Sequence, residues 1–157
     1  MQALVRELSA LLKEKGLMLA TAESCTGGMV AMAVTDEAGS SSVFERGFVT
    51  YSNDSKAELL DVSREILENK GAVSRECAEA MVHGVFAHSR ASLALSITGI
   101  AGPSGATHRK PVGLVYIGCG LRGAPVTVTE HLFTGTRAHI RKESAETALK
   151  LALSSLQ

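Results

Sequence analysis

The sequence predicts an α/β fold with a mixed sheet that is covered by helices on both faces. Short apolar runs alternate with longer segments of helical periodicity, and this alternation is typical of strands that are joined through helices. Two strand-like segments near the C-terminus follow one another across a short turn, which indicates an antiparallel hairpin and hence a sheet that is not purely parallel.

In the first part of the chain, apolar residues recur at helical spacing up to Gly16, a residue that commonly ends helices. We expect a buried strand over residues 17–22, which are mostly apolar, and a second strand over residues 44–51, which contain strand-prone side chains. Small side chains in residues 28–34 predict a helix that packs closely on the sheet. Residues 36–42, rich in Gly and Ser, form the expected loop before the second strand.

Later elements are marked by capping residues and by glycines. Helices are expected to begin at Asn53, Ser63, Ser74 and Thr136, because such side chains accept hydrogen bonds from helix N–H groups. Strands are expected over residues 91–98, 112–120 and 125–133. The loop between the first two of these strands contains three glycines and a proline.

Length and composition limit the classes of protein that this chain can belong to. A length of 157 residues predicts a single domain over 1–157, and sixteen basic residues balance sixteen acidic ones. Without a net basic field we expect neither nucleic-acid nor membrane partners. Cys25, Cys77 and Cys119 are too widely spaced for a zinc site and odd in number, so we expect reduced thiols and a cytoplasmic location.

The stretch with most chemical potential is Thr-Ala-Glu-Ser-Cys-Thr-Gly-Gly at residues 21–28, between the first strand and the next helix. It places Ser24, Cys25 and Thr26 beside an expected helix N-terminus, whose free N–H groups favour negative charge. Gly27 would let a ligand approach the main chain closely. The alternative is that these side chains only cap the helix.

Other motifs are less informative. Residues 118–123 match GxGxxG, but a β-like run follows instead of a helix, so we interpret them as a hairpin turn rather than a dinucleotide site. His83 and His88 are five residues apart, which does not bring both rings to one metal as a spacing of four would. We expect no metal site and no cofactor.

Three further segments contain candidate binding or catalytic residues, and each also has a simpler structural explanation. Thr98, Gly99 and Gly102 follow a buried strand, where a glycine-rich turn can surround a ligand with main-chain N–H groups, or can simply need positive φ. Arg137 at a helix start fits a phosphate site or a solvated arginine. Lys56, near the start of a helix just after Tyr51, opposes the helix dipole, so it is either solvated or a base that is kept neutral.

Taken in order, these segments resemble the CinA C-terminal domain family, the nicotinamide-mononucleotide deamidases. The matching blocks are residues 21–28, 42–53 with Lys56, 71–74, 96–103 and 110–113, and the FxGxR pattern from Phe133 to Arg137. The resemblance covers nearly the whole chain. Thr134 and Thr136 stand where some relatives carry Pro and Asp.

The resemblance implies a three-layer α/β/α fold with a mixed, mostly parallel sheet, and hydrolysis of the carboxamide of nicotinamide mononucleotide. The nucleotide is then a small-molecule substrate, not a cofactor, and a homo-oligomer is expected. The implied nucleophile is Ser24, with Tyr51 and Lys56 as partners. The implied substrate contacts are Thr98, Gly99, Gly102 and Arg137. Main-chain N–H groups at Cys25, Thr26 and Gly27 would bind the oxyanion.

Two alternatives remain open at this point. The nucleophile could be the thiol of Cys25, with Glu23 and Lys56 completing a Glu-Lys-Cys amidase, because thiols are the better nucleophiles. Alternatively the chain could be a non-catalytic module that binds nucleotides or a partner. Release of ammonia from the nucleotide distinguishes an enzyme from a binder.

Overall fold

A five-stranded mixed sheet forms the centre of the computed structural model, which describes all 157 residues. The strands run in the spatial order β2-β1-β3-β4-β5. β1 pairs in parallel with β2 and β3, whereas β4 is antiparallel to both β3 and β5. Their bounds are β1 Leu19–Glu23, β2 Phe44–Val49, β3 Leu93–Gly99, β4 Leu114–Leu121 and β5 Thr127–Leu132. The predicted α/β class with a mixed sheet and a late hairpin is confirmed.

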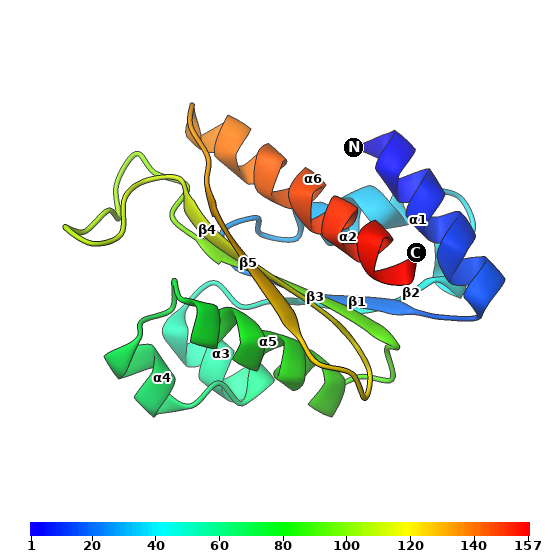
Figure 1. Cartoon of the computed structure of the whole chain (residues 1–157), viewed down its shortest axis with the longest axis horizontal. Helices are drawn as coiled ribbons and strands as arrows, with labels where there is room; N and C mark the ends of the chain where they lie inside the picture. Colours follow the sequence, from blue (N-terminus) through cyan, green and yellow to red (C-terminus); the bar gives the residue numbers. More distant parts are fainter.

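Helices cover both faces of this sheet and complete three layers (Figure 1). One face carries α1 (Gln2–Lys15), α2 (Met29–Thr35) and α6 (Arg137–Leu156), and a short 3-10 turn, η1 (Ser40–Ser42), precedes β2. The opposite face carries α3 (Asn53–Leu60), α4 (Arg64–Asn69) and α5 (Arg75–Ala87). No helix has both the length and the apolar character that crossing a bilayer requires.

Side-chain size differs between the two faces of the central strands. Leu19, Leu93 and Leu95 belong to the larger core under α1, α2 and α6, while Ala20 and Ala94 belong to the core under α3 to α5. Successive strand residues point to opposite faces, so this alternation separates a bulky face from a small one. The small face lets α5 approach the sheet closely.

The GxGxxG sequence takes part in this close approach. Gly118 and Gly120 lie within β4, and residues 122–123 form the turn to β5. A Cβ at Gly118 would lie 2.5 Å from Oγ of Ser96 and 2.9 Å from a methyl of Val82 on α5. These glycines therefore make room for α5. Only the last two residues of the motif lie in the hairpin turn, because the first four belong to β4.

Three of the four expected helix caps are confirmed. Ser63, Ser74 and Thr136 each accept a hydrogen bond from the N–H group three residues later. The prediction of Asn53 as a cap was wrong by one residue, because Ser52 accepts the N–H of Ser55 at 3.0 Å. Ser and Asn are similarly favoured as caps, so the sequence pattern alone does not distinguish between two adjacent ones.

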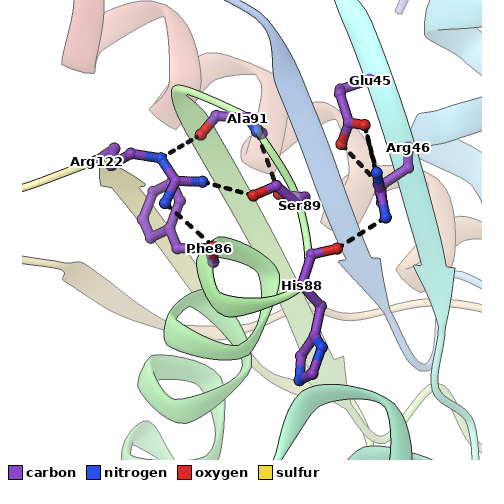
Figure 2. A network of polar contacts seen from close by, with 7 residues as sticks. All are labelled: Glu45, Arg46, Phe86, His88, Ser89, Ala91 and Arg122. Atoms are coloured by element: carbon purple, nitrogen blue, oxygen red, sulfur yellow. Dashed lines mark hydrogen bonds and ion pairs between the residues drawn. The ribbon is translucent and has the colours of Figure 1, made fainter.

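Arginine side chains fix the connection from α5 to β3 (Figure 2). The guanidinium of Arg122 donates to the carbonyl oxygens of Ala91, Ser89 and Phe86 at 2.9, 2.9 and 3.1 Å, and it lies over the Phe86 ring. Arg46, paired with Glu45, donates to the carbonyl of His88 at 2.8 Å. Carbonyls in the last turn of α5 and in the segment that leads to β3 thus have hydrogen-bond partners.

Candidate active site

The segments that leave the three parallel strands meet at one edge of the sheet. Ser24 follows β1, Tyr51 lies two residues beyond β2, and Gly99 is the last residue of β3. They line a cavity of about 280 Å³ together with Cys25, Lys56, Thr98, Gly102 and Arg137, among others. Open α/β sheets bind ligands outside the carboxyl ends of their strands, and this cavity lies at such an edge.

Lys56 is the buried amine of this cavity, with only 1% of its surface exposed. Its Nζ lies 3.0 Å from Oγ of Ser24, 2.7 Å from the carbonyl oxygen of Thr50 and 3.2 Å from that of Tyr51. None of the ion pairs in the chain includes Lys56. Burial without a carboxylate partner lowers the pKa of the amine.

The three neighbours of Nζ also fix where a lone pair would point. Main-chain carbonyls only accept hydrogen bonds, so a neutral amine spends its two N–H groups on Thr50 and Tyr51. The third direction then carries the lone pair, and it faces the Ser24 hydroxyl. This arrangement can remove a proton from the serine.

Glu23 accepts hydrogen bonds from N–H groups at the start of α2, which the sequence suggested would be free. Its Oε1 accepts from the hydroxyl of Thr26 at 2.7 Å and from the N–H of Val30 at 2.9 Å, and its Oε2 accepts from the N–H of Ala31 at 3.0 Å. The expectation that the first N–H groups of α2 face a ligand was therefore wrong. The helix starts later than expected, at Met29, and a buried carboxylate from β1 satisfies its first turn.

The N–H groups of the turn between Ser24 and α2 differ in their availability. The Gly27 N–H donates to the carbonyl of Ser24 at 3.0 Å, whereas those of Cys25 and Thr26 donate to no main-chain carbonyl. Gly27 and Gly28 have φ values of 62° and 98°, which other residues rarely adopt, so this turn requires glycine. The Ser24 N–H donates to Ile97 at 2.9 Å and holds the serine against β3.

The Cys25 thiol is buried at the wall of the cavity and has no hydrogen bond to Lys56. Burial raises the pKa of this thiol to about 11, although Lys56 and Arg141 oppose the shift. A thiol in this state is almost fully protonated at neutral pH, and the thiolate is the nucleophilic form.

The Tyr51 side chain makes no hydrogen bond to Ser24 or Lys56. The side chain is 62% exposed, and its phenolic oxygen accepts a hydrogen bond from Nη2 of Arg137 at 3.2 Å. Only the main-chain carbonyl of Tyr51 contacts Lys56. The structure thus brings the Tyr51 phenol to the arginine of the expected phosphate site rather than to the lysine.

The glycine-rich segment after β3 forms another wall. Thr98 is buried, and its hydroxyl donates to the carbonyl of Ala72 at 2.8 Å. A Cβ at Gly99 would lie 2.6 Å from a methyl of Val115, and one at Gly102 would lie 2.5 Å from a methyl of Val112. Glycine is therefore required at both positions, because a side chain would collide with Val115 or Val112.

Arg141 is a residue that the sequence analysis missed. From the second turn of α6, its Nε donates to the carbonyl of Cys25 at 3.0 Å and its Nη2 to that of Thr26 at 3.1 Å. The available signal was its spacing of four from Arg137, which puts both arginines on one side of the helix. The cavity contains no group of His, Cys, Asp and Glu side chains arranged for a metal ion.

Known proteins resemble this chain over nearly its full length. The profile of the CinA C-terminal domain family matches residues 1–156. The chain is 47% identical over 147 residues to the nicotinamide-nucleotide amidohydrolase PncC of Enterobacter agglomerans, a match that covers 94% of this chain and 90% of that protein. Other curated relatives are longer. A CinA-like protein of Geobacter sulfurreducens is 49% identical over 142 residues, and the match covers 90% of this chain but only 34% of that protein.

Solved structures agree with the fold. The competence/damage inducible protein CihA of Agrobacterium tumefaciens superposes with a TM-score of 0.97 at 44% identity, covering 99% of this chain and 95% of that one. The competence damage-inducible protein A of Klebsiella pneumoniae gives a TM-score of 0.95 at 32% identity, with coverage of 99% and 96%. Since sequence profile, relatives of similar length and fold agree from end to end, this chain belongs to the CinA C-terminal domain family.

Proposed function

We propose that this chain hydrolyses the carboxamide of nicotinamide mononucleotide to nicotinate mononucleotide and ammonia, with Ser24 as nucleophile and Lys56 as general base. The observation that carries the proposal is the 3.0 Å contact between Nζ of Lys56 and Oγ of Ser24, in a buried place without a carboxylate. The Enterobacter relative, a nicotinamide-nucleotide amidohydrolase by name that is 47% identical to this chain, supports the reaction and the substrate class.

The proposed reaction needs one proton carrier. As Oγ of Ser24 attacks the carboxamide carbon, the neutral amine of Lys56 takes the hydroxyl proton, as in Ser-Lys variants of the catalytic triad. The resulting ammonium gives this proton to the departing nitrogen, so the C–N bond breaks and ammonia leaves. Water then attacks the acyl-enzyme while Lys56 takes its proton and returns it to Ser24.

Charge on the tetrahedral intermediate has to be stabilised near Ser24. The N–H groups of Cys25 and Thr26 are the proposed donors, because the third expected donor, Gly27, already bonds to the Ser24 carbonyl. Thr98, Gly99 and Gly102 are proposed to contact the substrate from the opposite wall. Arg137 is proposed to bind the phosphate, with its guanidinium held by Gly102 and Tyr51.

Three observations favour Ser24 over the Cys25 alternative. The lysine contacts the serine oxygen, while burial keeps the pKa of the Cys25 thiol at about 11. Glu23, the acid of that alternative, has both oxygens engaged with α2 and Thr26.

A cytoplasmic location is part of the proposal because all three cysteines are free. The homo-oligomeric state stays a prediction.

Ammonia release from nicotinamide mononucleotide tests the proposal. The purified chain should release ammonia and form nicotinate mononucleotide in equal amounts, and Ser24→Ala should abolish both products. Ser154→Ala changes an exposed serine near the end of α6 and serves as the matched control. If the wild type releases no more ammonia than Ser24→Ala does, the chain is not this enzyme and the binding-module alternative gains support.

A further inference from the structure

Two hydrogen bonds from α6 hold the turn that follows Ser24. Nε of Arg141 donates to the carbonyl of Cys25 at 3.0 Å, and Nη2 donates to that of Thr26 at 3.1 Å. The Thr26 carbonyl also accepts from the N–H of Met29, but the Cys25 carbonyl has no main-chain donor. The orientation of the Cys25–Thr26 peptide therefore depends on Arg141.

The carbonyl and the N–H group of a trans peptide unit point in opposite directions. Because Arg141 holds the Cys25 carbonyl on the α6 side of the turn, the N–H of Thr26 in the same peptide unit points away from α6. That N–H donates to no main-chain carbonyl, although Thr26 is fully buried. Buried N–H groups almost always have a hydrogen-bond partner. An unpaired N–H next to a nucleophile is therefore suited to an acceptor that forms only during the reaction, such as an oxyanion.

The charge of Arg141 adds to this geometry. A guanidinium bound to a carbonyl oxygen draws electron density from the peptide unit, and hydrogen bonds in such a chain strengthen one another. The Thr26 N–H therefore becomes a stronger donor while its direction is fixed. Glu23 holds the other side of the turn through the Thr26 hydroxyl, so the residue is clamped between a carboxylate and a guanidinium.

We propose that Arg141 is a positioning residue for the oxyanion site: it orients and polarises the Cys25–Thr26 peptide so that the Thr26 N–H stabilises the tetrahedral intermediate on Ser24. This inference rests on the proposed Ser24 chemistry. It assigns Arg141 a role that differs from that of Arg137, which lies one turn earlier on α6 and contacts the far wall of the cavity. Arg137 is thus assigned to substrate binding in the ground state, and Arg141 to stabilisation of the transition state.

Kinetics of Arg141→Met and Arg141→Lys test the inference, with Lys142→Met as a control that removes an exposed cation from the next position of α6. Interactions made only in the transition state change kcat and leave KM nearly unchanged. Arg141→Met should lower kcat by about 10- to 100-fold, somewhat less than the 10²–10³ that loss of an oxyanion donor itself costs. The kcat of Arg141→Lys should lie between those of the wild type and Arg141→Met, because an ammonium cannot reproduce the two hydrogen bonds by which the guanidinium spans both carbonyls. Lys142→Met should match the wild type.

A tetrahedral probe separates this role from a structural one. Pyridine-3-boronic acid should form a tetrahedral adduct on Ser24, seen by boron NMR, and its affinity should fall in Arg141→Met by about the same factor as kcat. Affinity for nicotinate mononucleotide, which is planar at the carboxylate, should change less than about twofold. A structural role would weaken both ligands together, and that result would overturn the inference.

The probe also keeps the inference separate from the proposed function. Wild type that binds the boronate at Ser24 but releases no ammonia would contradict the proposed substrate while leaving the Arg141 comparison intact. Absence of a tetrahedral adduct in the wild type, or equal boronate affinity in wild type and Arg141→Met, would overturn the role of Arg141. If Arg141→Met fails to fold, the same comparison with Arg141→Lys decides.

Discussion

The phenolic oxygen of Tyr51 accepts a hydrogen bond of 3.2 Å from Nη2 of Arg137, although 86 residues separate the two in the chain. The carbonyl of Gly102 holds Nη1 of the same guanidinium at 2.8 Å. A guanidinium has five N–H donors, so three remain for an anion at the mouth of the cavity. This pair joins the segment after β2 to the first turn of α6 and defines the substrate end of the site.

Arg137→Ala should weaken the binding of nicotinamide mononucleotide much more than the binding of nicotinamide, which lacks the phosphate. A charge-assisted hydrogen bond contributes about 1.5–3 kcal/mol, so we expect a loss of roughly 10- to 100-fold in affinity for the mononucleotide. Isothermal titration into Ser24→Ala, which binds without turnover, measures both compounds. Arg109→Ala, an exposed arginine without a hydrogen-bond partner, is the control. Equal losses for the two compounds would remove Arg137 from the phosphate site.

Tyr51→Phe should raise KM for the mononucleotide and change kcat little. The phenol supports Arg137 and does not contact Lys56, and one neutral hydrogen bond contributes about 0.5–1.5 kcal/mol, or roughly 2- to 12-fold in affinity. Steady-state kinetics would show the split between KM and kcat. A Tyr51→Phe enzyme as inactive as Lys56→Met would instead mean that the phenol takes part in proton transfer.

The reaction should require the neutral, basic form of the Lys56 amine. Burial lowers the pKa of its amine, and only the neutral form accepts the Ser24 proton, so kcat/KM should rise with pH through a pKa below the model-peptide value of 10.5. Lys56→Arg should be nearly inactive because a guanidinium stays charged, and Lys56→Met should be inactive while still binding substrate. Substantial activity in Lys56→Arg across the pH profile would leave the lysine as a positioning charge only.

Cys25→Ala should retain most of the activity that Ser24→Ala loses. With the thiol pKa at about 11, fewer than about one thiol in a thousand is ionised at pH 7.5, so iodoacetamide should inactivate the wild type slowly. Parallel assays of the two variants, with and without iodoacetamide, give the comparison. An inactive Cys25→Ala together with rapid inactivation of the wild type would revive the cysteine mechanism.

Arg122→Ala should destabilise the fold without affecting catalysis. Its guanidinium satisfies three carbonyls between α5 and β3 (Figure 2), but the side chain is exposed, so we expect a loss of only about 1–2 kcal/mol. For a domain of this size that corresponds to a fall in Tm of roughly 2–8 °C. Arg109→Ala again serves as control in thermal denaturation. A fall in kcat at 25 °C, where the variant is folded, would contradict a purely structural role.

Features with local causes were predictable from the sequence. Caps such as Ser63 and Ser74 bond to an N–H only three residues away, so the pattern of neighbouring residues contains the whole interaction. The alternation of strands and helices likewise reflects periodicity within short segments. The error at Asn53 arose because Ser52 beside it is an equally good cap.

Interactions between distant segments could not be predicted in the same way. Glu23 bonds to N–H groups seven and eight residues ahead, outside the usual capping positions, because the strand-to-helix turn folds α2 back over the end of β1. The only local signal of Arg141 is its spacing of four from Arg137 on α6, and its hydrogen-bond partners lie more than a hundred residues earlier. Neither contact follows from the periodicity or from a motif.

The α/β class, the late hairpin, the family resemblance and most residues of the candidate site could be predicted from the amino-acid sequence. How these residues contact one another required the three-dimensional structure: which oxygen faces Nζ of Lys56, that Cys25 is a buried protonated thiol, and that the Tyr51 phenol contacts Arg137. Periodicity and capping patterns contain information only on interactions within a few residues. The pKa of a side chain depends instead on burial and on neighbours that the sheet brings together from β1, β2, β3 and α6.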